Sequence, residues 1–314
     1  ERHQRFFRFH IFSSAEAITA FGIDNMVRLG VDLVWIGFES QSRQSLFAKN
    51  TGIDPQELVG SLRDRGIAVL ASGILCMEHH TPANIQEDID FLVGLESDLV
   101  QFMLLTPVPV TALYRDHKKR GLLRTDLPLQ EWHGQTKLAY HHPAFSGDEP
   151  EQWMARAFRQ DYETNSSSML RMVETAIRGY EHLAAIEDRD ACLEARLSQF
   201  EQQARIWRLI LPAVEHHAVN EVERRRAREL GRRAQRHFGL RSWERLAGFS
   251  TTALSVLWKL RLQLFGDGIQ PRTIVTRYNQ ASKTGAGARF KERPALEDLE
   301  KRRLPPAAAA FSHD

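Results

Sequence analysis

The chain has 314 residues and a formal net charge of +2, with 42 lysines and arginines against 40 aspartates and glutamates. This balance excludes a protein whose main character is a strongly basic nucleic-acid-binding arm. The two cysteines, Cys76 and Cys192, are too few for a disulfide framework, a zinc ribbon or a three-cysteine cluster. No apolar run approaches the ~20 residues that cross a bilayer. The sequence therefore predicts a cytoplasmic protein without a membrane span.

The first part of the chain alternates predicted strands with predicted helices. Strands are expected at residues 6–12, 31–38, 67–75 and 99–105, and helices at 23–29, 55–65 and 82–94. Asp54 is a favourable N-cap ahead of Pro55, and Thr81 is the expected cap of the third helix. The apolar run 31–38 is typical of a strand buried on both faces. This alternation indicates an α/β fold with a parallel sheet, open or closed into a barrel.

The second part, from Glu151 onward, loses the strand pattern and is predicted to be helical. Apolar residues between Leu193 and Leu211 recur at spacings of three and four, as in a heptad-like stripe that packs on a neighbouring helix. Pro212 should kink or end that helix. Further helices are expected at residues 219–237 and 242–265. We expect a helical domain over residues 126–265 and a disordered tail over residues 266–314, where Gly, Pro and Ala are frequent.

The first candidate site lies at the carboxyl end of the strand 31–38, because parallel α/β folds gather their chemistry at such ends. Strand alternation puts Trp35, Gly37 and Glu39 on one face. Gly37 leaves room for a ligand, and the Glu39 carboxylate can accept hydrogen bonds from hydroxyl or ammonium groups. Ser40 adds a small donor and acceptor. The sequence leaves equally open that Glu39 caps the next helix.

The second strand end offers several groups that metals can bind: Cys76, Met77, Glu78, His79 and His80. Adjacent histidines on an extended chain point in opposite directions, so the sequence favours a polar loop and predicts no metal ligand here. A metal site joining these histidines to His133, His141 and His142 is disfavoured, since the sequence gives them no common face. The third strand end contains Pro107 and Pro109, which predict a rigid wall beside the site.

Three segments of the chain together carry a resemblance to a known family. The segments are VDLVWIGFESQS, GIAVLASGILCMEHHTPANIQEDIDFL and SDLVQFMLLTPVPVTALY. They resemble the second half of a radical S-adenosylmethionine barrel, most of all in the class that carries a cobalamin-binding domain ahead of the barrel. The similarity spans residues 6–123, and the stretches 132–135 and 141–145 are reminiscent of helical extensions in long family members.

The resemblance implies a fold, cofactors and site residues. Residues 1–125 would be the C-terminal half of a partial (β/α) barrel. Adenosylmethionine would be held at its ribose or methionine part by Gly37, Glu39 and Ser40, and its adenine would be bordered by backbone near Leu75, Cys76 and Thr106. A 4Fe–4S cluster would receive one electron from a reductant and pass it to adenosylmethionine. This step would cleave adenosylmethionine to methionine and a 5′-deoxyadenosyl radical. Cobalamin in an upstream domain would carry a methyl group to a small-molecule or lipid-like substrate, which the sequence does not identify.

The departures from the family concern its cluster and its turns. The CxxxCxxC loop that would hold the cluster is missing, and the residues at 76, 78, 79, 80, 110 and 112 differ from the family's turn pattern. We expect the cluster ligands to lie upstream of residue 1, in a longer parent of which this chain is an inactive fragment. The alternative is a cluster-free relative. Unpaired strand edges of a half barrel also predict poor stability in isolation.

Two non-enzymatic alternatives compete with this interpretation. Seven arginines crowd the predicted helix 219–237, at positions 224, 225, 226, 228, 232, 233 and 236, and could hold phosphates of RNA or tRNA. Interleaved glutamates offer i,i+4 ion pairs and aromatic residues that could stack on bases are absent from this run, so the sequence favours a solvated helical face. A non-catalytic interaction module could instead use the stripe from Leu193 to Leu211, although packing on the barrel is the more economical use of it.

Overall fold

The computed structural model describes residues 7–40, 52–239 and 241–266. The described residues up to Gly266 belong to one compact unit. The predicted tail lies outside the described residues, except for Gly266 at its start.

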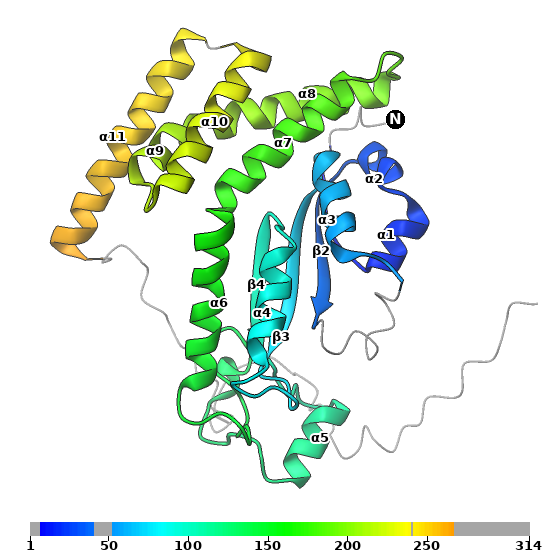
Figure 1. Ribbon diagram of the computed structural model, residues 1–314, viewed down its shortest axis with the longest axis vertical. Coiled ribbons are helices and arrows are strands. Elements are labelled where there is room, and N and C mark those ends of the chain that lie inside the picture. The colour runs from blue at the N-terminus through cyan, green and yellow to red at the C-terminus, as the bar shows by residue number, and fades with distance from the viewer. Residues whose placement is uncertain (1–6, 41–51, 240, 267–314) are drawn as a thin grey trace, which may run out of the picture. The chain divides into compact units, whose positions relative to one another are not determined.

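Four parallel strands form one sheet in chain order: β1 (Phe9–Ser13), β2 (Val31–Glu39), β3 (Ala68–Leu75) and β4 (Leu99–Leu104). The connections contain α1 (Ala15–Phe21), α2 (Ile23–Leu29), α3 (Pro55–Asp64) and α4 (Ile85–Gly94). Figure 1 shows β2, β3 and β4 with α1, α2, α3 and α4 in the middle of the molecule, between α8 above and α5 below. The predicted α/β class and parallel sheet are confirmed. In the described part of the chain the sheet is open, and β1 and β4 are its edges.

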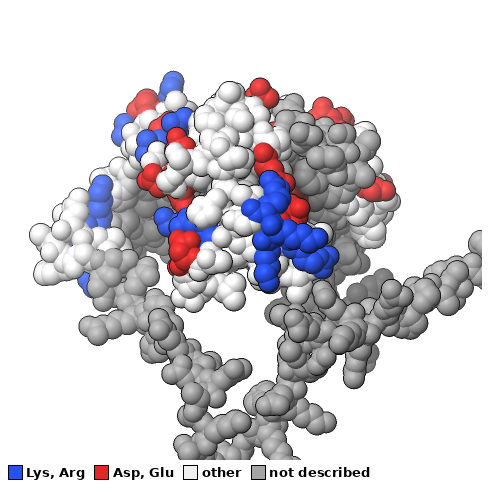
Figure 2. Space-filling model, turned by 90° about the horizontal axis from the view of Figure 1, so that it is seen from below, with Lys and Arg blue, Asp and Glu red and all other residues white. Residues whose placement is uncertain are grey.

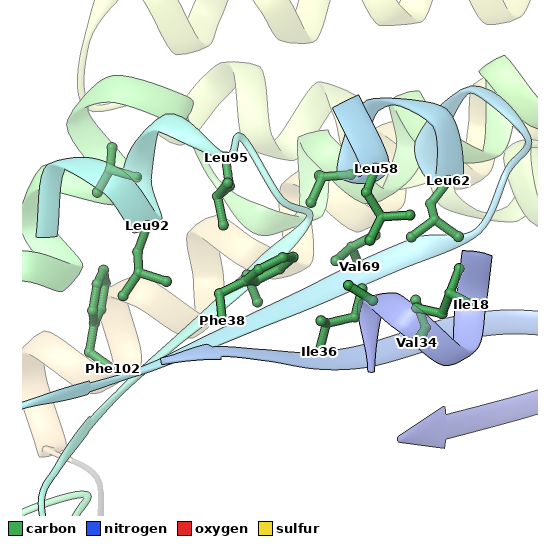
Figure 3. Close-up of a cluster of buried hydrophobic side chains, with 14 of the residues drawn as sticks. Ile18, Val34, Ile36, Phe38, Leu58, Leu62, Val69, Leu92, Leu95 and Phe102 are labelled. Carbon is green, nitrogen blue, oxygen red and sulfur yellow. The ribbon is translucent and has the colours of Figure 1, made fainter. Parts of the chain in front are cut away.

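One face of the sheet carries the main core. Figure 3 shows Ile36 and Phe38 of β2 pointing toward the helices, where Leu58 and Leu62 of α3 and Leu92 of α4 meet them. The alternate residues of β2 on the other face are only half-buried. The expectation that residues 31–38 are buried on both faces is therefore wrong, because their second apolar row does not face the helical layer that buries the first.

Local capping explains where several helices begin and end. Asp54 Oδ1 accepts hydrogen bonds from the backbone N–H groups of Gln56 (2.9 Å) and Glu57 (3.3 Å), which confirms the predicted N-cap of α3. The predicted cap at Thr81 is wrong, because α4 begins at Ile85 with Asn84 as its N-cap. The Asn84 side chain instead accepts a hydrogen bond from the Thr81 N–H (2.7 Å), which folds the preceding residues into a turn ahead of the helix.

From Glu149 to Phe265 the described chain is helical, as predicted for the part after Glu151, whereas residues 126–148 of the predicted helical domain are mostly irregular. The chain after β4 forms α5 (Ala112–Lys119), a 3₁₀ turn η3 (Leu129–Glu131), α6 (Glu149–Asn165), α7 (Ser168–Ala184), α8 (Ala191–Trp207), a 3₁₀ turn η4 (Arg208–Ile210), α9 (Leu211–His217), α10 (Glu221–Phe238) and α11 (Ser242–Phe265). The predicted apolar stripe packs within the chain: Phe200 joins the core of the sheet, while Ala204 and Leu211 join a second core with α7 and α10. Among the described residues, no helix combines the length and apolar composition that a bilayer span needs.

Buried polar contacts tie the amino end of the sheet to α7. The carboxylate of Asp98, just before β4, accepts hydrogen bonds from the Thr175 hydroxyl (2.6 Å) and from the Val69 N–H (2.9 Å). Arg171 donates to the Asp98 carbonyl (3.1 Å) and binds both oxygens of Asp161. These satisfied groups stabilise the end of the strands opposite to the candidate site.

Candidate functional site at the carboxyl ends of the strands

The carboxyl ends of the strands point toward the end of the molecule that carries α5 (Figure 1). Figure 2 views the molecule from that end and shows Lys and Arg side chains gathered beside a few acidic groups. The predicted site residues lie at the ends of β2 (Gly37, Glu39 and Ser40), β3 (Leu75 and Cys76) and just beyond β4 (Thr106). Parallel pairing brings these strand ends to one edge of the sheet.

A β-bulge shapes the end of β2. Gly37 pairs with Ser72, but the register then shifts so that Glu39 pairs with Gly73. Glu39 adopts a left-handed backbone conformation (φ 64°), and Ser40 is fully buried. The predicted shared face therefore holds for Trp35 and Gly37, but simple alternation does not extend to Glu39. The cap of α3 is Asp54 and not Glu39.

The half-buried face of the sheet carries polar groups that sequence reasoning missed. Trp35 Nε1 donates a hydrogen bond to Ser72 Oγ (2.8 Å), and Gln101 lies beside Ser72 in the register of β3 with β4. Gly37, Ser72 and Gln101 thus form one row across three strands. Within the described residues, the buried Gln101 Oε1 has no hydrogen-bond partner. An unpaired buried acceptor is costly, so this row favours a polar ligand that donates a hydrogen bond.

Two hydrogen bonds to backbone carbonyls hold the end of β3 in place. The Cys76 carbonyl accepts a hydrogen bond from the Tyr140 hydroxyl (2.6 Å), and the Leu75 carbonyl accepts one from the Leu105 N–H (2.9 Å). Cys76 also has a left-handed backbone conformation (φ 53°). Burial raises the pKa of the Cys76 thiol to about 12, so it stays protonated near neutral pH. A protonated, buried thiol is a poor nucleophile and a poor metal ligand.

Two buried histidines fasten the loop after β3. His80 Nδ1 accepts from the Met77 N–H (3.0 Å), so its proton resides on Nε2, which lies 2.9 Å from the Asp88 carboxylate. His142 Nδ1 accepts from the Ala144 N–H (3.0 Å), and its Nε2 donates to the Met77 carbonyl (3.0 Å). Burial lowers the pKa of His142 and keeps it neutral. In His80 and in His142, both ring nitrogens already have a polar partner within the chain. This arrangement favours the predicted polar loop over a metal site that would use these two rings.

A second polar cluster joins this loop to α5. His117 is fully buried and its Nδ1 donates to the Leu113 carbonyl (3.0 Å), which leaves Nε2 3.9 Å from the Glu78 carboxylate. The carboxylates of Glu78 and Asp116 both bind the guanidinium of Arg120. Arg120 therefore already forms ion pairs with both acids that a cation would need, and the contacts fix α5 against the strand ends.

The third strand end is closed by the stretch 132–135. The Gly134 carbonyl accepts from the Leu104 N–H (2.7 Å), and the Thr106 hydroxyl donates to the Leu104 carbonyl (3.1 Å). Gly134 has a positive φ of 72°, and a Cβ there would lie 2.8 Å from Thr106 Oγ1. Glycine is thus needed for this close approach. The predicted site residue Thr106 lies at the edge of the candidate site. Its hydroxyl proton is already used in the hydrogen bond to the Leu104 carbonyl.

Comparison of the chain with protein-family models finds no matching family, and a search of curated proteins finds no matching relative. The strand ends combine a half-buried carboxylate at Glu39 with backbone carbonyls at Leu75 and Cys76. Further down the same sheet, in the middle of β4, lies the Gln101 amide oxygen, which has no hydrogen-bond partner among the described residues. Each of these groups accepts hydrogen bonds, so the arrangement suits a ligand rich in donors.

Proposed function

We propose that the carboxyl ends of β2, β3 and β4 bind adenosylmethionine, as the C-terminal half of a radical S-adenosylmethionine barrel. The observation that carries this proposal is the row of Gly37, Ser72 and Gln101 on the half-buried face, with its unpaired amide oxygen. Adenosylmethionine offers an ammonium group, two ribose hydroxyls and an adenine amino group as donors. Glycine at position 37 leaves space for the ligand against the sheet.

The topology of the sheet supports the barrel part of the proposal. Strands in the order β1-β2-β3-β4, with α3 and α4 packed on one face, are arranged as in a segment of a (β/α) barrel. Further strands beside β1 or β4 would close such a barrel and bury the face that is now half-exposed. The polar row at Gln101 would then line its interior near the mouth.

Individual groups fit parts of the proposed ligand. The Glu39 carboxylate suits the ribose hydroxyls or the ammonium group, and Gln101 Oε1 can accept from either. The carbonyl oxygens of Leu75 and Cys76 each accept one hydrogen bond, and a carbonyl has a second lone pair that an adenine amino group can use. Ser40 and Thr106 would border the same ligand.

The residues of this chain do not fit the iron–sulfur cluster of that family. Such a cluster needs at least three thiolates, whereas the chain has two cysteines. Cys76 is held as a thiol, and the Cys192 thiol contacts the Arg28 carbonyl (3.4 Å) at the end of α2, far from the strand ends in question. Cluster ligands, cobalamin and any methyl transfer would therefore depend on protein outside these 314 residues. The substrate, whether a small molecule or lipid-like, is not assigned.

The alternative of RNA binding through α10 has weaker support. Arg226 binds Glu174 and Arg233 binds Glu181, both on α7, and Arg228 binds Glu215 on α9. The expectation of ion pairs within a solvated helical face is thus only partly met, because these arginines join α10 to its neighbours. Charges used in this way are less available to phosphates.

Calorimetric titration of the full chain with adenosylmethionine tests the proposal. We expect saturable binding that weakens about tenfold in Gln101→Leu, where the ligand loses an acceptor, and by about tenfold or more in Glu39→Gln, where it loses a charge. Gln152→Leu, on the exposed face of α6, is the matched control and should bind like the parent chain. Absence of saturable binding, or equal affinity in Gln101→Leu, would contradict the assignment.

A further inference from the structure

Helix α11 presents an apolar face to solvent over its whole length. The large apolar side chains that are between 48% and 77% exposed are Trp243, Leu246, Phe249, Leu254, Leu257, Trp258, Leu260, Leu264 and Phe265. At 100° per residue these positions fall within about half of the circumference, so they lie along one broad side of this 24-residue helix. A contiguous exposed patch of this kind marks a surface that something else covers.

The opposite face of α11 is polar and is the face that packs against the protein. Glu244 is 2% exposed and binds the Arg208 guanidinium. A Cβ on Gly248 would lie 3.4 Å from Pro212, and the Ser255 hydroxyl lies 3.0 Å from His217 Nε2 on α9. The usual amphipathic arrangement is thus inverted, since the small and polar residues face inward and the leucines and tryptophans face outward.

The charged residues that α11 itself offers beside this apolar face are basic, whereas the adjoining groove also contains Glu215 and Glu229. Arg245, Lys259 and Arg261 are the charged residues on α11 besides the buried Glu244. Along one edge, at Phe249, the face adjoins a groove of about 1300 Å³ between α9, α10 and α11, which Arg225 and Arg232 also line. At the left of Figure 2, where the end of α11 is seen, the charged groups on a mostly uncharged surface are Lys and Arg.

Six arginines line this groove, and three of them are available to an external anion. In the described part of the chain, Arg225, Arg232 and Arg245 have no ion-pair partner, whereas neighbouring Arg228 is paired with Glu215. The Arg261 guanidinium stacks over the Trp258 ring at 4.8 Å, so its charge lies against the apolar face. A suitable occupant must combine a broad apolar surface with negative charge.

We propose that α11 is an interfacial helix that binds the surface of an anionic lipid bilayer. The helix is about 36 Å long and would lie in the plane of the interface, with its leucines and aromatic rings among the acyl chains. The arginines and the lysine would reach the headgroups, as long basic side chains do at membrane surfaces. A second copy of the chain fits less well, because it would bring the same basic residues against each other. This inference is independent of the proposed adenosylmethionine site.

Flotation of the full chain with lipid vesicles tests the inference. We expect it to float with vesicles of phosphatidylcholine containing about 30% phosphatidylglycerol, and only weakly with phosphatidylcholine alone. Replacing Leu246, Leu257 and Leu264 together by serine should reduce binding at least about 30-fold. The matched control replaces Leu129, Ile206 and Val219 by serine, since these are equally exposed but lie outside α11.

A second variant separates charge from apolar contact. Arg225→Gln combined with Arg232→Gln and Arg245→Gln should remove most of the preference for anionic vesicles and its dependence on salt. Absence of flotation with anionic vesicles overturns the inference. Flotation that is unchanged by the three serine substitutions in α11 also overturns it, as does flotation that appears only after residues 267–314 are removed. A third contradicting result is a dimer, seen by light scattering, that the serine substitutions dissociate while the chain binds no vesicles.

Discussion

Three buried side chains, Tyr140, His80 and His142, hold the loop that follows β3. Tyr140 binds the Cys76 carbonyl, His142 binds the Met77 carbonyl and His80 accepts from the Met77 N–H. The sequence pointed to this loop through its histidines but gave no sign of Tyr140, which lies 64 positions from Cys76. Such a contact depends on the tertiary fold and leaves no local pattern.

Removing the Tyr140 hydroxyl tests this anchoring role. Tyr140→Phe should lower the free energy of unfolding by about 1–3 kcal/mol, because the buried Cys76 carbonyl loses its partner. Tyr114→Phe is the matched control, since its ring contacts Trp132 and its side chain is only half-buried. Urea unfolding of both variants measures the difference. Equal stability of Tyr140→Phe and the parent chain would mean that the hydroxyl does not hold the loop.

Ionisation of the Glu174 carboxyl should make the free energy of unfolding depend on pH. Burial opposes its ionisation, but hydrogen bonds and charges from Arg226 and Arg178 outweigh that effect and lower its pKa from 4.5 to about 2. Because the native pKa lies below the unfolded value, the stabilisation is fully present above pH 4.5 and is lost as the pH falls toward 2. The amount is about 3 kcal/mol.

Unfolding by urea at pH 6 and pH 3 measures this contribution. The parent chain should lose more stability between these values than Glu174→Gln, which is less stable at pH 6 but has no carboxyl to protonate there. Glu187→Gln, at an exposed position, should follow the parent chain. If Glu174→Gln and the parent chain show the same dependence on pH, the ion pairs with Arg178 and Arg226 do not lower this pKa.

At the scale of elements, local signals predicted much of the secondary structure. The bounds of α2 and α11 are those expected from the sequence, because Gly30 ends α2 in a left-handed conformation and Ser242 starts a long apolar pattern. Helix α1 was not predicted, although it is as long as α2 and Ser14 caps its start by accepting a hydrogen bond from the Ala17 N–H (3.2 Å). The start of α4 was placed too early because the Asn84 side chain binds backbone in a turn.

The junction between α3 and α7 gives a prediction at this scale. Gly66 has a φ of 79°, and a Cβ there would lie 2.5 Å from the Phe200 ring and 2.8 Å from the Gly179 Cα. Gly66→Ala should therefore lower the free energy of unfolding by about 3 kcal/mol or more. Gly60→Ala is the matched control: a Cβ on Gly60, inside α3, meets nothing within 4 Å, so alanine should stabilise by about 0.5–1 kcal/mol.

Thermal and urea unfolding of the two glycine variants check this pair directly. If both variants were destabilised to the same extent, the loss of stability would come from any glycine-to-alanine change near α3 and not from the close contacts of Gly66. Little effect of Gly66→Ala alone would mean that α7 and α8 can move away from the turn at low cost. Either result would contradict the close packing of Gly66 on Gly179 and Phe200.

For the whole molecule, the sequence predicted the fold class but not which surfaces are covered. Both β2 and α11 are rich in apolar residues, yet one face of β2 forms the core while the outer face of α11 meets solvent. The row of Gly37, Ser72 and Gln101 was missed because it depends on the register of three strands. Periodicity identifies an apolar face, whereas only the assembled sheet and helices decide what lies against it.

Hydrogen–deuterium exchange of the chain with and without adenosylmethionine tests the central claim most directly, because it locates the ligand without any substitution. We predict slower exchange in the carboxyl-terminal parts of the strands, over residues 37–40, 72–77 and 101–106, and no change in α9, α10 and α11. Protection confined to the arginine-lined groove beside α11, or no protection anywhere at saturating adenosylmethionine, would contradict the proposed site.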